Sequence, residues 1–263
     1  MKSSAEYIKE GAIFHGSVPH VMGTRLEMLA VGTPEEVIMP VWERLRHLVC
    51  RLDAILNRFE PTSEVSVLNM SDNPLELEMS EELKEMVELS DMYYDKTQGL
   101  FDVVDSDGKL DFGGFAKGYF LVKCDELLRR KDVKCAFVDF GGSSILGIGH
   151  HPYGDSWKVG VVDPYTKLQI KEISLVDKAM STSGNAPSYS GHIRHPLTGE
   201  KCSGRKLVTV ISANALDAEV LSTVLMIASE EESCRILDNF PSVSVDIILS
   251  AALSECKSSL YLR

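Results

Sequence analysis

The chain has 263 residues, of which 44% are hydrophobic and 25% charged, a balance typical of soluble globular proteins. This length is sufficient to bury a sizeable core, and we expect a single domain over residues 1–263. The formal net charge of −12 argues against nucleic acid and anionic membranes as partners. A ligand that carries phosphates would therefore require a metal ion or a local group of basic side chains.

Cysteine usage and apolar runs indicate the compartment. The six cysteines are scattered and include no Cys-x-x-Cys pair, which disfavours a zinc site or a redox dithiol. Free thiols in a reducing cytosol are the usual state of such cysteines. The sequence contains no apolar run typical of a signal peptide or a transmembrane helix. We therefore expect a cytoplasmic protein without a transmembrane segment.

The elements predicted along the chain mix helices with strands. Apolar residues recur every three or four positions from Val37 to Phe59, which is the helical period, and Pro61 ends this run. In chain order we expect two strands within 12–31, helices at 34–59, 63–69, 80–96 and 115–130, strands at 134–140, 143–148, 157–162 and 168–175, a polar loop at 181–199, a strand at 206–212, helices at 214–229 and 230–239, and strands at 243–250 and 258–262. Because several strands are neighbours in sequence, this order favours an α+β fold with largely antiparallel sheets.

The segment STSGNAPSYSGHIRHPLTG at 181–199 holds hydroxyls, glycines, histidines and prolines, with little that could fill a core. Ser181, Thr182 and Ser183 are hydrogen-bond donors, and Gly184 would let backbone N–H groups approach an anion. This composition indicates polar ligand chemistry. The alternative is a long connection rich in turns.

Two glycine pairs flank predicted elements. Gly113-Gly114 precedes a helix, where the backbone can approach a phosphate near the positive helix end, and Lys117 adds a charge. The spacing is not that of a Walker loop, and a close packing turn is the alternative. Gly141-Gly142 joins two strands. The pair either exposes backbone without side chains to a flat or anionic ligand or forms a bulged hairpin.

The helix that follows Asn214 carries a possible cation site. Glu219 and Thr223 are four residues apart, so both project from one helix face and both could reach a hard cation such as Mg²⁺. Asp217 and Glu219 would also suit the first helical turn as partners of its dipole. The sequence leaves both interpretations open.

A series of short motifs follows in one order: Met22-Gly23-Thr24, Pro61-x-Ser63-Glu64-x-Ser66-x-x-Asn69, Gly99-x-Phe101-Asp102, Gly113-Gly114-Phe115-Ala116-Lys117-Gly118, Gly141-Gly142, Trp157-x-x-Gly160-x-x-Asp163-Pro164, Thr182-Ser183-Gly184, His192-x-x-x-Pro196-x-Thr198-Gly199 and Ala218-Glu219-x-Leu221-Ser222-Thr223. Together they span most of the chain and resemble the ApbE-like FAD:protein FMN transferases. The resemblance implies an ApbE-like, T-fold-related architecture.

The resemblance also implies an activity. Family members bind FAD with Mg²⁺ and transfer the FMN half to a Ser or Thr hydroxyl of an acceptor flavoprotein, with release of AMP. On this chain the metal would be held by the Ala116 carbonyl oxygen, Glu219 and Thr223. The residues that would contact the flavin nucleotide are Met22 and Phe59 at the isoalloxazine ring, Lys117, Ser183, Gly184 and His192 near the ribityl and pyrophosphate groups, and Gly23, Thr24, Gly141, Gly142 and Thr182. Asp217 and His192 are alternatives for the general base.

The chain departs from the family pattern at several positions. Glu219 stands where the family usually has Asp, and one extra methylene is a large displacement for an octahedral Mg²⁺ site. Phe59 replaces a Tyr, whereas His195 and Ser143 replace Asp or Asn. Only VVDSDGK at 103–109 remains where the family has a long insert.

These departures motivate the alternatives to a flavin transferase. A more open site would admit water and give an FAD pyrophosphatase that releases FMN and AMP. An altered metal ligand would give a flavin-binding protein with little turnover. A structural homologue without a ligand is a further alternative.

Overall fold

The computed structural model describes residues 3–187, 193–196, 198–249 and 259–262. Its main element is a nine-stranded sheet in the order β1-β2-β3-β4-β5-β8-β9-β10-β11, in which all neighbouring strands are antiparallel. The strands are β1 Ser4–Ile8, β2 Ile13–Val21, β3 Thr24–Val31, β4 Ala136–Phe140, β5 Ser144–Ile148, β8 Lys178–Gly184, β9 Lys206–Ser212, β10 Ser244–Leu249 and β11 Ser259–Leu262. A separate antiparallel hairpin consists of β6 Trp157–Val162 and β7 Gln169–Leu175. The α+β fold predicted from sequence is confirmed.

Several of the helices begin where the sequence supplies a capping side chain. Ser63, Ser80 and Asn214 each accept a hydrogen bond from a backbone N–H group of the first helical turn. The helices are α1 Glu35–Leu56, α2 Glu64–Met70, α3 Glu81–Lys96, α4 Ala116–Arg130, α5 Ala215–Ile227 and α6 Glu230–Leu237, with a short 3-10 turn at Pro74–Glu76. None of the helices within the described ranges is long and apolar enough to cross a membrane.

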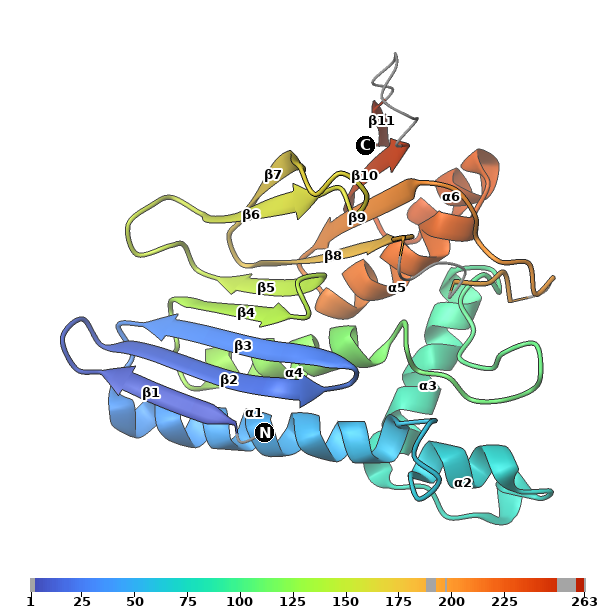
Figure 1. The fold of residues 1–263 in the computed structure, drawn as a ribbon, viewed down its shortest axis with the longest axis horizontal. Coiled ribbons are helices and arrows are strands. Elements are labelled where there is room, and N and C mark those ends of the chain that lie inside the picture. Colours follow the sequence, from blue (N-terminus) through green and yellow to red (C-terminus); the bar gives the residue numbers. More distant parts are fainter. Residues whose placement is uncertain (1–2, 188–192, 197, 250–258, 263) are drawn as a thin grey trace.

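One face of the large sheet is covered by helices, with α1 along β1 to β3 and α4 and α5 against the central strands (Figure 1). Side chains alternate along each strand, so Ala136, Val138 and Phe140 of β4 enter the core on the helical side. Phe137 contacts the smaller apolar cluster on the opposite face. The larger core therefore lies between the sheet and helices α1, α4 and α5.

The β6–β7 hairpin covers the other face of the central strands (Figure 1). Trp157, Val159 and Val161 alternate with exposed residues along β6 and pack towards Ile145 and Met180 of the large sheet. Strand β5 is covered on both faces, which explains why all of its residues are buried. Polar side chains on β5 must therefore find partners inside the protein.

The polar segment 181–199 does not begin as a loop. Ser181, Thr182, Ser183 and Gly184 end strand β8, which pairs with β5 on one side and β9 on the other. The prediction of a loop over these residues was wrong because their composition is polar, whereas the surrounding protein supplies partners for their hydroxyls. Residues 188–192, including His192, lie outside the described part of the chain.

Two other expectations from sequence require correction. Helix α1 ends at Leu56 and not near residue 59, because Asn57 forms a turn in which its side chain accepts a hydrogen bond from the Phe59 N–H. The Phe59 side chain is 83% exposed and takes no part in the buried helical stripe. Strand β1 was not predicted, and its short, mostly exposed sequence offers little periodic signal.

Candidate functional site

Antiparallel pairing brings several of the predicted ligand-binding motifs to one edge of the sheet. Leu26, just after the β2–β3 turn, is paired with Phe140 at the end of β4. Ser144 at the start of β5 is paired with Phe140 and also with Ser181 of β8. Motifs that are far apart in the sequence therefore lie along a single edge.

Two tight turns form one part of this edge. Gly141 and Gly142 join β4 to β5 with φ angles of 74° and 71°, in the left-handed region that favours glycine. A Cβ atom at Gly141 would lie 2.7 Å from the Thr24 Oγ1 atom of the neighbouring β2–β3 turn. In that turn, the Met22 backbone N–H donates a hydrogen bond of 3.0 Å to Asp53 Oδ1 at the end of α1. The Met22–Thr24 and Gly141–Gly142 motifs are therefore in contact.

Glycines also allow the beginning of α4 to approach α5 closely. A Cβ atom at Gly118 would lie 2.5 Å from the Cβ atom of Glu219 and 3.1 Å from the Ala215 carbonyl oxygen. A Cβ atom at Gly114 would lie 3.3 Å from Thr223 Oγ1. The turn that leads into α4 and its first residues thus pack along the side of α5 that carries Glu219 and Thr223.

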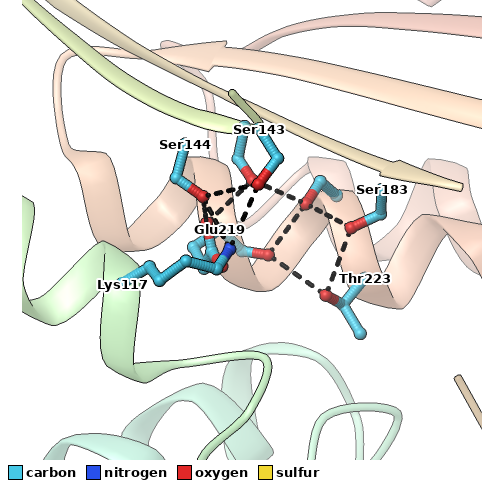
Figure 2. Close-up of polar contacts among 8 residues, drawn as sticks. Lys117, Ser143, Ser144, Ser183, Glu219 and Thr223 are labelled. Atoms are coloured by element: carbon cyan, nitrogen blue, oxygen red, sulfur yellow. Dashed lines mark hydrogen bonds and ion pairs between the residues drawn. The ribbon is translucent and has the colours of Figure 1, made fainter. Parts of the chain in front are cut away.

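A group of polar side chains fills the junction between α4, α5, β5 and β8 (Figure 2). We call it the Glu219 cluster, and it consists of Lys117, Ser143, Ser144, Ser181, Ser183, Glu219, Ser222 and Thr223. Its floor is buried, whereas its rim is partly exposed at Lys117, Ser143, Ser183 and Thr223. The cluster therefore offers charged and hydroxyl groups to a molecule that binds from outside.

Glu219 is the centre of this cluster. Its Oε1 atom lies 2.5 Å from the Lys117 ammonium, and its Oε2 atom accepts hydrogen bonds from Ser144 and Ser181 at 2.6 and 2.8 Å. The glutamate side chain is 4% exposed and that of Lys117 is 21% exposed. One buried carboxylate therefore connects two helices and two strands.

The surroundings of Glu219 favour its charged form. Burial by itself would raise the pKa of the carboxyl group, but the charge of Lys117 and the hydrogen bonds from Lys117, Ser144 and Ser181 lower it below the usual value. Glu219 is consequently an anion at neutral pH and balances the charge of the ammonium. The two charges of the cluster cancel.

The hydroxyl groups continue from the carboxylate towards the rim. Ser222 lies within 3.1 Å of Ser181 and 2.9 Å of Ser183, measured between Oγ atoms. Thr223 donates a hydrogen bond to the Glu219 carbonyl oxygen at 3.3 Å and lies 3.5 Å from the Ser183 hydroxyl. Ser183 and Thr223 are thus the hydroxyl groups at the outer end of the chain of hydrogen bonds.

The donor chemistry of this junction suits a divalent cation such as Mg²⁺. The Glu219 carboxylate, the Thr223 hydroxyl and the carbonyl oxygen of Ala116 are all hard oxygen ligands. Across the described ranges, no three or more His, Cys, Asp and Glu side chains gather as a metal site. The one carboxylate of the set also has an ammonium partner already. A cation bound there would have to share Glu219 with Lys117 or displace it.

A hollow of about 280 Å³ lies between α2 and the turn at 105–110 and includes Phe59, Asn69 and Leu110 in its lining. Arg58 contacts the Phe59 ring at 5.0 Å and forms an ion pair of 2.7 Å with Asp111. Asp111 in turn accepts a hydrogen bond from the Gly113 N–H at 2.9 Å. These contacts connect the exposed Phe59 ring to the glycine turn that precedes α4.

The structure separates three of the predicted site residues from the Glu219 cluster. Asp217 accepts a hydrogen bond of 2.6 Å from the Tyr93 hydroxyl, on the side of α5 that faces α3. The Thr182 hydroxyl lies 3.0 Å from Thr209 of β9, on the opposite face of the sheet from Ser181 and Ser183. A Cβ atom at Gly184 would lie 2.5 Å from a side-chain carbon of Leu207.

Sequence reasoning missed Ser144 as a member of the site. A usable signal was present, because alternation along β5 places Ser144 on the same face as Leu146 and Ile148, which belong to the core on the helical side. A serine on a buried strand face requires a polar partner. Glu219 of the facing helix provides it.

Comparison with known sequences identifies the family. The sequence profile of the ApbE family matches residues 22–106 and 104–247, which is well over half of the chain. The chain belongs to the ApbE family. The resemblance inferred from the motifs is therefore confirmed.

Curated relatives match part of the chain. The FAD:protein FMN transferase of Treponema pallidum is 30% identical over 51% of this chain and 42% of its own length. The protein of the same name from Klebsiella pneumoniae is 29% identical over 54% of this chain and 48% of its own length. The chain thus spans less than half the length of these two relatives. The solved structure of the flavin transferase ApbE from Vibrio cholerae covers 95% of both chains with a TM-score of 0.76 at 19% identity, which shows a shared fold.

Proposed function

We propose that this protein transfers FMN from FAD to a Ser or Thr hydroxyl of an acceptor flavoprotein. The observation that supports this proposal best is the Glu219 cluster, which places an ammonium, a carboxylate and a row of hydroxyls beside two glycine turns. Relatives in the ApbE family carry the name FAD:protein FMN transferase. An acidic chain needs such a local arrangement if it is to bind a diphosphate.

The residues of this site suit the parts of FAD. Met22 and the exposed Phe59 provide apolar surface for the isoalloxazine ring. Lys117 provides positive charge for the diphosphate, and the hydroxyls of Ser183 and Thr223 can donate hydrogen bonds to phosphate oxygens. Gly142 can bring its bare backbone close to the ligand, because no atom lies within 4 Å of the position of a Cβ atom there.

The proposed reaction is a displacement at phosphorus. The acceptor oxygen forms a bond to the FMN phosphorus, the bond from that phosphorus to the bridging oxygen breaks, and AMP leaves with the bridging oxygen. The acceptor hydroxyl gives its proton to a base. Of the two candidates, Asp217 is bound to Tyr93 and lies apart from the Glu219 cluster, which favours His192. A Mg²⁺ ion held by Ala116, Glu219 and Thr223 would supply charge neutralisation on the diphosphate. Lys117 orients the diphosphate, and the glycine turns keep bulky side chains away from the diphosphate.

The test is an assay of transfer with both products measured. The protein is incubated with FAD, Mg²⁺ and a panel of flavoproteins that carry FMN on a Ser or Thr hydroxyl, and adducts are detected by mass spectrometry. We expect an FMN adduct together with an equal amount of AMP. Binding of FAD without any adduct across the panel would contradict a transferase.

The short segment after Phe101 motivates hydrolysis as a second activity. Residues 103–110 form a tight turn in which Val104 bridges Leu110 and the Asp105 N–H donates to the Lys109 carbonyl oxygen at 2.8 Å. A site without the long family insert would admit water as the attacking group. Release of AMP and free FMN without an acceptor would identify this activity in the same assay.

A further inference from the structure

The Lys117 ammonium lies next to the Glu219 carboxylate, in the position that a bound cation would need. Its ammonium lies 2.5 Å from Glu219 Oε1, 2.7 Å from Ser144 Oγ and 3.5 Å from Ser143 Oγ. Figure 2 shows that Lys117 enters from α4, whereas Glu219 enters from α5. While the ammonium stays there, a divalent cation that approaches Glu219 meets a like charge.

The side chains of Glu219 and Lys117 differ in how freely they can move. Glu219 is buried, and its other oxygen is fixed by Ser144 and Ser181. Lys117 is partly exposed, stands at the rim, and has a long flexible side chain. The carboxylate is therefore the fixed partner, and the ammonium is the one that can change position.

We propose that Lys117 acts as a resident counter-ion that blocks Glu219, so that a divalent cation binds tightly only after the diphosphate of FAD has drawn the ammonium away. This inference rests on the proposed function, because it assigns an order of binding to the same site. A diphosphate carries the negative charge that the ammonium needs as a new partner. The carboxylate thus released is in turn available to the cation. Lys117 serves Glu219 in the free protein and FAD in the complex.

The first test measures Mn²⁺ binding to protein free of FAD. Mn²⁺ accepts the same oxygen ligands as Mg²⁺ and can be titrated by electron paramagnetic resonance. We expect Lys117→Met to bind Mn²⁺ at least about tenfold more tightly than the unchanged protein, the scale on which partners of metal ligands alter affinity. Equal affinities would overturn the proposal.

Matched variants separate the loss of this one charge from effects elsewhere in the protein. Lys123→Met removes a lysine on the same helix that pairs with Glu85, outside the cluster, and should leave Mn²⁺ affinity unchanged. The double variant Lys117→Met with Glu219→Gln should lose the gain in affinity, because no carboxylate remains. If Lys117→Met does not fold, Lys117→Gln retains a neutral donor to Glu219 and should show the same direction of change. A gain in affinity that persists in the double variant would place the Mn²⁺ elsewhere and contradict the proposal.

The second test measures coupling between FAD and Mn²⁺. In the unchanged protein each ligand should raise the affinity of the other by the same factor, because the coupling is reciprocal. This factor should shrink in Lys117→Met, and an unchanged factor would contradict the proposal. Both tests measure binding without turnover, so they can succeed even if no acceptor is modified. Conversely, FMN transfer together with equal Mn²⁺ affinities would retain the proposed function and reject the role of Lys117.

Discussion

Helix α5 presents two acidic side chains, two positions apart, to regions of different character. Glu219 lies among hydroxyls and one ammonium between α4, β5 and β8. Asp217 points towards α3, where Tyr93 donates a hydrogen bond to it and stacks on Phe240 at a centroid distance of 6.2 Å. One carboxylate therefore belongs to a charged and partly open cluster, and the other belongs to an aromatic core.

The different surroundings of Glu219 and Asp217 show how two acidic residues on one helix can serve function in one case and stability in the other. The region around Asp217 uses a buried aromatic donor, the Tyr93 hydroxyl, which stabilises the packing of α3 against α5. The Glu219 cluster keeps exposed donors at its rim, although an apolar junction would hold the helices together as well. Polar groups at such a junction therefore fit ligand binding better than stability.

The comparison predicts unequal effects on activity. Replacing Glu219 by Gln should reduce FMN transfer by about 100-fold, because the neutral amide no longer balances Lys117 or provides an anionic ligand. Asp217→Asn should change the rate by a small factor, because Asp217 is bound to Tyr93 and lies apart from the cluster. Initial rates of AMP release measure both. A large loss in Asp217→Asn with normal folding would instead support Asp217 as the base.

A second prediction tests how closely the cluster depends on the approach of α4 to α5. In Gly118→Ala the new Cβ atom would lie 2.5 Å from that of Glu219, so one helix must shift. We expect a loss of about 1–3 kcal/mol in the free energy of unfolding, together with weaker FAD binding.

The matched control for this substitution is Gly154→Ala, because the nearest atom to its added Cβ would be 3.8 Å away. It should change stability by less than about 0.5 kcal/mol. Urea unfolding compares the two variants. Equal stability of both would show that the helices have room that the structure does not indicate.

Much of the fold could be predicted from periodicity, and the two wrong predictions have different physical causes. The helical period identified α1 and α3, but it continued past Leu56 to Phe59, because an apolar residue at the right spacing says nothing about the turn formed by Asn57. Strand β8 was hidden by its polar composition. Ser181 is buried there because Glu219, far along the chain, accepts its hydrogen bond, and Ser222 provides a partner for the partly exposed Ser183.

The candidate site, like the fold, could be predicted only in part from the sequence. The spacing of Glu219 and Thr223 on one helix face and the two glycine turns could be read directly from sequence. The pairing of Lys117 with Glu219 could not, because it depends on how two helices cross at Gly118. Sequence alone also left Asp217 open as a general base, and only its hydrogen bond to Tyr93 separates it from the Glu219 cluster.

The aromatic side of α5 predicts a smaller effect, on stability. Tyr93→Phe removes the hydroxyl that donates a hydrogen bond of 2.6 Å to Asp217 Oδ1, and we expect a loss of about 1.5 kcal/mol in the free energy of unfolding, as for hydrogen bonds to charged groups. FMN transfer should be unaffected. The control is Tyr153→Phe at a side chain that is 90% exposed, which should be neutral. A neutral result for Tyr93→Phe would show that Asp217 finds an equally good partner.

The last and smallest effect concerns alkaline pH. Burial raises the pKa of Tyr93 far above its ordinary value of about 10, and the charge of Asp217 and its hydrogen bond raise it further. When the pH rises above about 10, the unfolded chain loses this proton and the folded protein keeps it. The stabilising contribution of Tyr93 is therefore complete below that pH and declines above it.

Tyr93→Phe has no such proton to lose, so the difference in unfolding free energy between the unchanged protein and this variant should shrink by about 1.4 kcal/mol between pH 9 and pH 11. Urea unfolding at several pH values measures this difference, in which the titration of other groups cancels. A constant difference up to pH 11 would mean that Tyr93 ionises as easily in the folded protein as in the unfolded chain. The aromatic side of α5 would then be as open to solvent as the rim of the Glu219 cluster, and the contrast between the two regions would be lost.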